Sequence, residues 1–291
     1  MRFPKTLLCF LLIVILFQGA SFASASRSPL AEYFIQDVGS SIAKGVDPQH
    51  LSFFYDQKNH KNRRGVILIH GFTAYPVEVR KLGKFLASNG FVVYGVRLPG
   101  HGIAPEAMLD TNWKDWVESV EDVYQAMKKS MGKVYLVGTS TGGIIALDIA
   151  AKEKVDGIVC VSAPIELQNK YADLARTLVP AANFLGINAG YEYWGDLWIP
   201  EKNYEKYPRK NVLELLELID DVKENMPKVT APILILQATR DRIVNPSSAE
   251  YIYKHVGSKV KYLQYVDARH VDYVYQWNQP VYNKILRFLK R

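Results

Sequence analysis

The chain has 291 residues, of which 48% are hydrophobic and 22% charged, and its formal net charge at pH 7 is +7. This composition is typical of a globular protein with a substantial core and excludes a disordered or fibrous chain. The basic residues are scattered, and their tightest cluster, between Lys58 and Arg64, is interpreted as a solvated loop before a strand. Because no basic stripe or nucleic-acid motif accompanies it, no nucleic-acid partner is expected.

The N-terminus has the pattern of a secretory signal peptide. A basic start precedes the apolar run from Leu7 to Phe17, and the small residues Ala23-Ser24-Ala25 follow. The run is shorter than the roughly 20 residues of a spanning helix, so a cleaved signal over residues 1–25 is predicted. The alternative is an uncleaved N-terminal membrane anchor. If the signal is cleaved, the mature chain is residues 26–291, and it is expected to be exported to the periplasm or secreted, without stable membrane insertion.

Cysteine use fits an exported protein that is stabilised by its core. Cleavage after Ala25 would remove Cys9 and leave Cys160 without a partner for an internal disulfide. Cys160 lies in the apolar run from Gly157 to Val161, where a small buried hydrophobic side chain is expected rather than a reactive thiol.

Helical and strand patterns alternate along most of the chain. Helical patterns cover residues 30–44, 77–89, 113–131, 144–151, 247–255 and 281–290. Strand patterns cover residues 51–56, 66–69, 91–96, 134–137, 155–161, 233–237 and 260–265. This alternation predicts an α/β fold with a mostly parallel central sheet and helices on both faces.

The alternation stops between about residues 165 and 227, in a segment that is largely helical in pattern and rich in aromatic residues. We interpret this segment as a small helical cap inserted after the sixth strand, over the carboxyl ends of the strands, where open α/β sheets bind ligands. Trp194 and Trp198 are its candidate substrate-binding residues. The alternative is a helical extension packed on the sheet with no role in ligand binding.

The most informative segment runs from Val134 into an apolar helix over residues 144–151. Between strand and helix lies Gly138-Thr139-Ser140-Thr141-Gly142, which matches the Gly-x-Ser-x-Gly motif of a nucleophile elbow in the required context. The small glycines allow strand and helix to approach closely, and the sharp turn presents the serine hydroxyl. Ser140 is therefore the predicted nucleophile. The alternative is a connection that binds an anion or no ligand.

A serine nucleophile requires a base and a group that orients the base. Asp241 follows the strand pattern at 233–237, and His270 follows that at 260–265. The order Ser140, Asp241, His270 is that of the α/β-hydrolase triad. Asp267 is the alternative acid, three residues before His270.

Two backbone amides are predicted to hold the oxyanion. One is the amide of Thr141, next to the nucleophile, and the other is that of Phe72 in the turn His70-Gly71-Phe72. His70 and His101 lie beside glycines and are expected to have structural or oxyanion-loop roles. The other three histidines apart from His270 are interpreted as surface or helix residues, namely His50, His60 and His255.

Several motifs together resemble the α/β-hydrolase superfamily. They are His70-Gly71-Phe72, Leu98-Pro99-Gly100-His101-Gly102, the helix from Trp113, Gly138 to Gly143, Asp241 with Val244, and His270. From about residue 50 to 291 the chain resembles the bacterial carboxylesterase and monoacylglycerol lipase group, with a hydrolase domain of the serine aminopeptidase S33 type. The resemblance implies ester hydrolysis through an acyl-enzyme, a small helical cap, and no metal or other cofactor.

Two departures from the group leave the substrate open. Threonine flanks Ser140 where a bulky or acidic residue is commoner, and the segment from Leu30 to Lys44 is additional. The expected function is that of an exported serine carboxylesterase or lipase acting on a small ester or acylglycerol. A thioesterase or peptidase with the same triad, or a non-catalytic binding protein on this fold, are the alternatives. The sequence does not define acyl-chain length or oligomeric state.

Overall fold

The computed structural model describes residues 28–56, 63–168, 174–185, 190–199 and 201–291. The predicted signal peptide and Cys9 lie outside these ranges, so the prediction of a cleaved signal remains a prediction. Within the described ranges, no helix has the length and apolar character needed to cross a membrane.

The centre of the fold is a seven-stranded sheet with the strand order β1-β3-β2-β4-β5-β8-β9. Its strands are β1 (Phe53–Tyr55), β2 (Arg64–Ile69), β3 (Phe91–Val96), β4 (Lys133–Thr139), β5 (Gly157–Val161), β8 (Ile233–Ala238) and β9 (Lys261–Val266). Only β1 is antiparallel to its neighbour among these strands. The mostly parallel sheet predicted from the alternating pattern is therefore confirmed.

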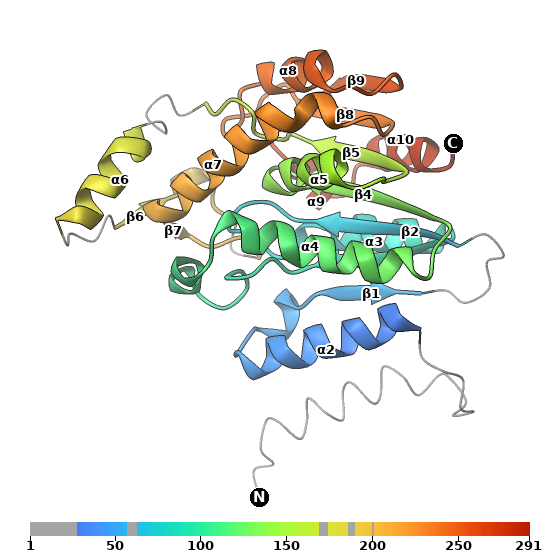
Figure 1. The fold of residues 1–291 in the computed structure, drawn as a ribbon, viewed down its shortest axis with the longest axis horizontal. Coiled ribbons are helices and arrows are strands. Elements are labelled where there is room, and N and C mark those ends of the chain that lie inside the picture. Colours follow the sequence, from blue (N-terminus) through green and yellow to red (C-terminus); the bar gives the residue numbers. More distant parts are fainter. Residues whose placement is uncertain (1–27, 57–62, 169–173, 186–189, 200) are drawn as a thin grey trace, which may run out of the picture.

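Helices cover both faces of the sheet (Figure 1). One face packs against α2 (Pro29–Ala43), α4 (Trp113–Lys128), α5 (Thr141–Lys152), α7 (Arg209–Asn225) and α8 (Ser247–His255). The other packs against α3 (Val77–Ser88), α9 (Asp272–Tyr275) and α10 (Gln279–Leu289). Because both faces are covered, β3, β5 and β8 are buried along their whole length, which explains their continuous apolar sequences.

Local signals set the bounds of the long helix α4. The Asn112 side chain accepts hydrogen bonds from the amides of Lys114 and Asp115, and the Asp115 carboxylate accepts one from the Asn112 amide. This reciprocal capping satisfies amides that the helix itself leaves without partners. The buried face of α4 consists of apolar residues that recur at helical spacing, namely Trp116, Val117, Val120, Val123, Tyr124 and Met127.

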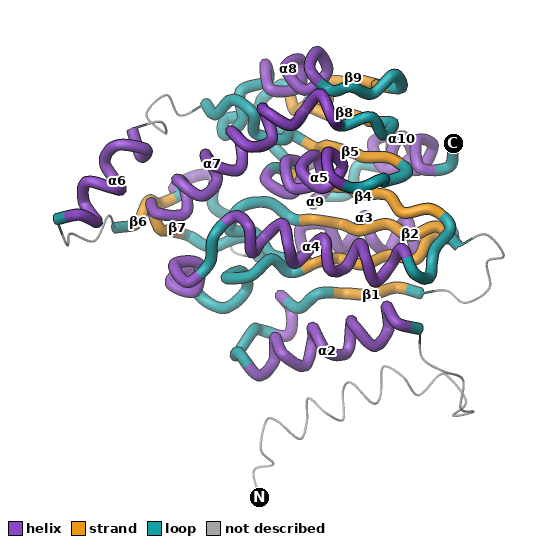
Figure 2. Tube along the Cα trace, viewed as in Figure 1, coloured by secondary structure: helices purple, strands orange, loops and turns teal. Residues whose placement is uncertain are grey.

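The segment between β5 and β8 is inserted into the alternating pattern. It contains α6 (Ala175–Phe184), β6 (Tyr191–Tyr193), β7 (Lys206–Pro208) and α7, and β6 pairs with β7 as a separate antiparallel sheet. Figure 2 shows this strand pair beside the helices of the insertion. Short 3-10 helices complete the described chain: η1 (Pro48–His50), η2 (Pro105–Asp110), η4 (Gly195–Leu197) and η5 (Met226–Lys228).

The position of the insertion corrects the expected strand count. Five strands of the described chain precede it, and they correspond to the five strand patterns found before residue 165, so the insertion follows the fifth strand and not the sixth. The expected helical character is also incomplete, since β6 and β7 pair across the insertion.

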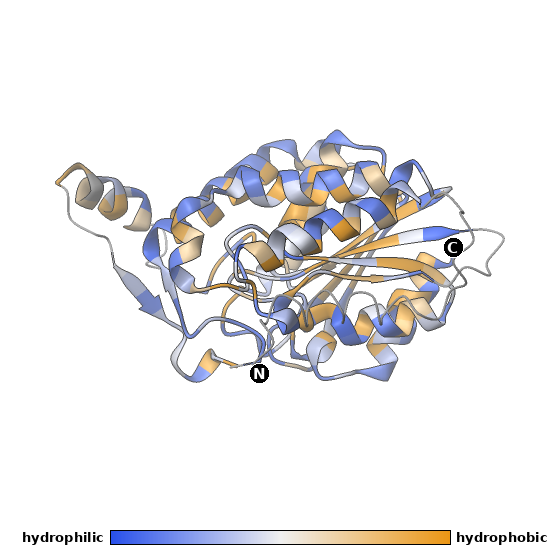
Figure 3. Ribbon diagram, turned by 90° about the horizontal axis from the view of Figure 1, so that it is seen from below, coloured by the Kyte–Doolittle hydropathy of each residue, from blue (hydrophilic) through white to orange (hydrophobic). Residues whose placement is uncertain are grey.

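The two helices of the insertion differ in their packing. The apolar face of α7, including Leu218 and Val222, belongs to the main core. In contrast, α6 projects from one end of the molecule (Figure 3), and Phe184 at its end is 90% exposed. The insertion therefore combines a helix that completes the core with a helix that packs against the core at Ala175 and ends in an exposed side chain.

Candidate active site

Ser140 occupies a sharp turn between β4 and α5. Its backbone has φ 51° and ψ −122°, a conformation that is costly for a residue with a side chain. A Cβ atom on Gly138 would lie 2.0 Å from the carbonyl oxygen of Gly142, and one on Gly142 would lie 2.3 Å from that of Ile69. Glycine is therefore required on both sides of Ser140, which gives the physical reason for the motif seen in the sequence.

The loops after β8 and β9 bring Asp241 and His270 into contact. His270 Nδ1 lies 2.8 Å from Asp241 Oδ2. Because a carboxylate only accepts hydrogen bonds, Nδ1 carries a proton, and whenever the ring is neutral Nε2 is left as the acceptor. The geometry therefore gives His270 the tautomer that a general base for a serine requires.

Asp241 is held by several donors in a buried position, and its side chain is fully buried. Its Oδ1 accepts hydrogen bonds from the amides of Ile243 and Val244, at 3.0 and 2.9 Å. Burial alone would raise the pKa of Asp241, but the charge of His270 and the hydrogen bonds from His270, Val244 and Ile243 together lower it below the ordinary value. Asp241 is therefore a carboxylate near neutral pH.

Asp267, the alternative acid, lies in a different environment. Its side chain is 82% exposed and forms an ion pair with Arg240 at 2.8 Å. In the hydrogen bonds of the described residues, the imidazole of His270 pairs with Asp241 and not with Asp267.

The turn after β2 lies directly beside Ser140. A Cβ atom on Gly71 would be 3.1 Å from Cβ of Ser140. Among the hydrogen bonds of the described chain, neither the Phe72 amide nor the Thr141 amide has a protein acceptor. Both predicted oxyanion donors are thus next to the serine, with N–H groups available to a ligand.

Two buried histidines fix this turn. His70 Nε2 accepts a hydrogen bond from the Leu98 amide at 3.2 Å, and His101 Nε2 accepts one from the Thr73 amide at 3.1 Å. Their Nδ1 atoms lie 2.9 Å from the carbonyl oxygens of Gly71 and Pro99, respectively. Both rings therefore act in their neutral form as links between the loops after β2 and β3.

Burial lowers the pKa of both histidines. It lowers the pKa of His101 to about 4, and it lowers the pKa of His70 well below the ordinary value with a further contribution from His101. Protonation would remove the Nε2 acceptors, so the folded state resists it.

We expect these histidines to make the protein less stable in mild acid. Between pH 6.5 and about 4 the unfolded chain binds protons at His101 and the folded chain does not, so stability is full above this window and falls as the pH decreases through it. The loss through His101 should reach up to about 3 kcal/mol. Urea unfolding at neutral pH and at about pH 4.5 should show a smaller pH dependence in His101→Gln than in the wild type.

His255→Gln provides the control, because His255 is exposed at the end of α8. It should keep the pH dependence of the wild type. Equal pH dependence in His101→Gln and the wild type would contradict the assignment of a neutral, buried His101.

Ser140 and His270 line one cavity of about 520 Å³, including its open mouth. The wall from the core of the fold consists of Gly71, Phe72, Ala74, Glu78, Thr141, Pro164 and Ile243. The wall from the insertion consists of Leu167, Trp194, Leu197, Lys202, Asn203 and Leu215. Serine, base and both oxyanion candidates thus face a common, mostly apolar space.

The two tryptophans predicted to bind substrate differ in position. Trp194 lines the cavity, and its indole Nε1 donates a hydrogen bond to Thr73 Oγ1 at 3.0 Å. Trp198 is not among the lining residues, is 38% exposed, and donates to the carbonyl oxygen of Asn203. The structure therefore brings only Trp194 to the serine.

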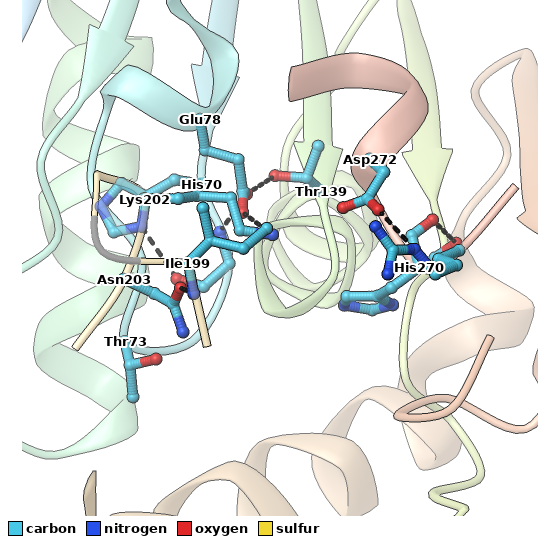
Figure 4. A network of polar contacts seen from close by, with 12 residues as sticks. His70, Thr73, Glu78, Thr139, Ile199, Lys202, Asn203, His270 and Asp272 are labelled. Carbon is cyan, nitrogen blue, oxygen red and sulfur yellow. Dashed lines mark hydrogen bonds and ion pairs between the residues drawn. The ribbon is translucent and has the colours of Figure 1, made fainter. Parts of the chain in front are cut away.

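Sequence reasoning missed a polar network next to the serine (Figure 4). Glu78 Oε1 accepts hydrogen bonds from the Gly71 amide at 3.0 Å and from Thr139 Oγ1 at 2.5 Å. Lys202 Nζ lies 3.8 Å from Glu78 Oε2. An acidic residue in the first turn of a helix is common, so no local sequence pattern indicates that Glu78 is buried at this position.

Other candidate groups lie away from this site. Burial raises the pKa of the Cys160 thiol, which fits the small buried side chain predicted for it. Within the described ranges, no group of three or more His, Cys, Asp or Glu side chains is arranged so that it could hold a metal ion.

The fold is that of an α/β hydrolase. The chain belongs to the family described as serine aminopeptidase, S33, whose sequence profile matches residues 60–191 and 202–271. This confirms the resemblance found in the sequence motifs.

Relatives within this family are known as ester hydrolases. The chain is 29% identical over 232 residues to a carboxylesterase of Bacillus subtilis (strain 168), covering 78% of this chain and 93% of that protein. It is 31% identical over 205 residues to a thermostable monoacylglycerol lipase of Bacillus sp. (strain H-257), covering 68% of this chain and 78% of that protein. At family level, these relatives support an ester hydrolase.

A solved structure supports the fold. A structure described with LipS and LipT, two metagenome-derived lipolytic enzymes, matches with a TM-score of 0.72 and 24% identity, covering 84% of this chain and 99% of that one. This similarity shows a shared fold and does not identify the substrate.

Proposed function

We propose that the protein is a serine carboxylic ester hydrolase that works through an acyl-enzyme at Ser140. The observation that carries the proposal is the hydrogen bond from His270 Nδ1 to the buried Asp241 carboxylate, with His270 and Ser140 lining the same cavity. In the proposed reaction His270 Nε2 takes the proton of the Ser140 hydroxyl as its oxygen attacks the ester carbonyl carbon.

The tetrahedral intermediate carries a negative charge on the former carbonyl oxygen. The amides of Phe72 and Thr141 are proposed to bind this oxygen, which is the largest single contribution to catalysis in many acyl transfers. His270 then gives its proton to the alcohol as the carbon–oxygen bond breaks, leaving an acyl group on Ser140. A water molecule, deprotonated by His270, attacks the acyl carbon, and the acid leaves as Ser140 regains its proton.

The apolar lining favours an ester with an alkyl or acyl chain. The lining includes the large apolar side chains of Phe72, Leu167, Trp194, Leu197 and Leu215. Apolar walls with a few directed polar groups are typical of sites for small organic ligands. The names of the relatives, carboxylesterase and monoacylglycerol lipase, agree with a carboxylic ester or acylglycerol as substrate.

The family description makes an aminopeptidase the second candidate. Recognition of a peptide amino terminus requires a carboxylate that is free to bind an ammonium group. Glu78 is the acidic side chain among the described lining residues, and it is already engaged by Gly71, Thr139 and Lys202. The arrangement therefore favours ester over peptide substrates.

The purified full chain should be assayed on p-nitrophenyl esters of graded acyl length and on amino-acid p-nitroanilides. The proposal requires that the esters are hydrolysed with a higher kcat/KM than the anilides. It also requires that kcat/KM changes with acyl length and has a maximum at a preferred length. Hydrolysis of the anilides alone would overturn it in favour of a peptidase. Thioester analogues of the same chain lengths separate an esterase from a thioesterase.

The insertion is proposed to act as a cap that contributes to the acyl-binding surface, with Trp194 as its contact residue. If this is correct, Trp194→Phe should shift the chain-length preference, because the indole that faces the cavity becomes smaller while an aromatic ring remains for packing. Trp198→Phe, at a position outside the cavity lining, is the matched control. The chain-length profile and melting temperature of each variant decide the point: an unchanged profile with a lower melting temperature in Trp194→Phe would mean that this tryptophan only packs the insertion.

We also propose that the enzyme is exported. The proposal is supported by residues 1–25, where a basic start is followed by an apolar run and then by small residues. N-terminal sequencing of the protein recovered from outside the cytoplasm should begin near Ser26. Recovery of the full-length chain in the membrane fraction alone would support an N-terminal anchor instead.

A further inference from the structure

The Lys202 side chain is a buried cation in the wall of the cavity that contains Ser140. The residue is 7% exposed and lines the cavity from the side of the insertion. Burying an ammonium group is costly unless other groups compensate its charge and use its three N–H donors. The contacts of this ammonium therefore indicate what it is arranged to bind.

These contacts leave donors unused. Lys202 Nζ is 3.8 Å from Glu78 Oε2, which is an ion pair but longer than a hydrogen bond. Its other neighbour is the ring of Tyr275, whose centre is 5.9 Å away. Within the described chain, Nζ donates no hydrogen bond to a protein acceptor, and its position in the lining makes its donors available to a ligand.

The backbone holds Lys202 firmly against the turn beside Ser140. Its amide donates to the carbonyl oxygen of Ile199 at 2.9 Å, and its carbonyl oxygen accepts from the Tyr75 amide at 3.0 Å. The adjacent Asn203 forms a β-bridge with Ala74. Figure 4 shows Lys202 and Asn203 beside the residues of this turn. The backbone that carries the ammonium is thus held against the turn beside Ser140.

Glu78 determines which acceptors this cation favours. Its carboxylate balances the charge of Lys202 and holds the Gly71 amide at the same time. A second full negative charge near the ammonium would be repelled by Glu78, whereas a neutral hydroxyl oxygen would not. The pair is therefore better suited to a neutral oxygen acceptor than to an anion.

We propose that Lys202 is a specificity residue whose ammonium donates a hydrogen bond to a hydroxyl oxygen of the substrate, so that the enzyme favours esters of polyols over esters of plain alcohols. The inference rests on the proposed ester hydrolysis at Ser140. It adds a role for a residue of the insertion: the selection of a hydroxylated substrate at the catalytic cavity.

The test compares three substrates of similar size on each variant: propyl butyrate, 2,3-dihydroxypropyl butyrate and monopropyl succinate. They offer no additional oxygen, two hydroxyl groups and a carboxylate, respectively. Lys202→Met keeps an unbranched side chain that is one atom shorter and lacks the hydrogen-bond donors. The quantity measured is the ratio of kcat/KM for the dihydroxypropyl ester to kcat/KM for the propyl ester. Both values are measured on the same variant, so each variant is its own reference.

The wild-type ratio should exceed one, and Lys202→Met should lower it about tenfold or more, because a hydrogen bond from a charged donor is lost. Lys206→Met is the matched control, since Lys206 is also a lysine of the insertion but pairs with Glu106 outside the cavity lining. It should keep the wild-type ratio. If removing the Lys202 charge leaves Glu78 uncompensated and the variant does not fold, Glu78→Gln/Lys202→Met removes both charges and should show the same lowered ratio.

An unchanged ratio in a folded variant that lacks the Lys202 ammonium would overturn the inference. A selective loss on monopropyl succinate would also overturn it, because Lys202 would then recognise an anion. Both results leave the proposed function intact, since the wild type would still cleave the esters. If the wild type cleaves none of the three esters, nor any of the p-nitrophenyl series, the proposed function itself fails.

Discussion

Replacing Ser140 with alanine should lower kcat for ester hydrolysis by on the order of 10⁴-fold or more, because no other side chain can take the place of the attacking oxygen. The fold should be unaffected. Alanine places the same Cβ atom in the strained turn, where φ is 51°, and removes only the hydroxyl oxygen.

Kinetics on a p-nitrophenyl ester and a melting curve on the same preparation check both parts of this expectation. Ser119→Ala is the matched control, because Ser119 lies on α4 with its hydroxyl bonded to the carbonyl oxygen of Trp116, away from the cavity. It should retain wild-type kcat. If Ser140→Ala retains a tenth of the wild-type activity, Ser140 is not the nucleophile.

The second large effect should separate the two carboxylates near His270. Asp241→Asn should reduce kcat by about 10⁴-fold, since asparagine can donate to the ring nitrogen, favours the wrong tautomer and cannot stabilise the imidazolium. Asp267→Asn should have little effect, because Asp267 is an exposed partner of Arg240.

The two substitutions make the same change of atoms, so the comparison isolates the position of the carboxylate. The pH dependence of kcat/KM should be measured on each. A larger loss in Asp267→Asn than in Asp241→Asn would contradict the role proposed for the hydrogen bond of 2.8 Å between Asp241 and His270.

The parts of the proposed site that could be predicted from the sequence depend on local geometry. The elbow at Ser140 can be recognised in the sequence because the tight turn excludes any Cβ atom at Gly138 and Gly142. The turn therefore requires a characteristic five-residue pattern. The contact between Asp241 and His270 could be expected because each follows a strand, and the carboxyl ends of parallel strands meet at one edge of a sheet.

Contacts between distant segments could not be predicted in the same way. Glu78 and Lys202 meet only after the insertion folds against the turn at Gly71. No local sequence pattern indicates that either residue is buried. Trp198 was named with Trp194 because both are aromatic, but only the position of each ring relative to the cavity distinguishes them. The pairing of β6 with β7 was missed because each strand has only three residues.

The central claim is that Ser140 forms the covalent acyl-enzyme, and the most direct measurement is identification of the residue that reacts with a fluorophosphonate probe. The full chain is incubated with the probe, digested, and the labelled peptide is sequenced by mass spectrometry. We predict one label per chain, on Ser140, and its loss when a good ester substrate competes for the site. A label on another residue, or an unlabelled protein that still hydrolyses esters, would contradict the account.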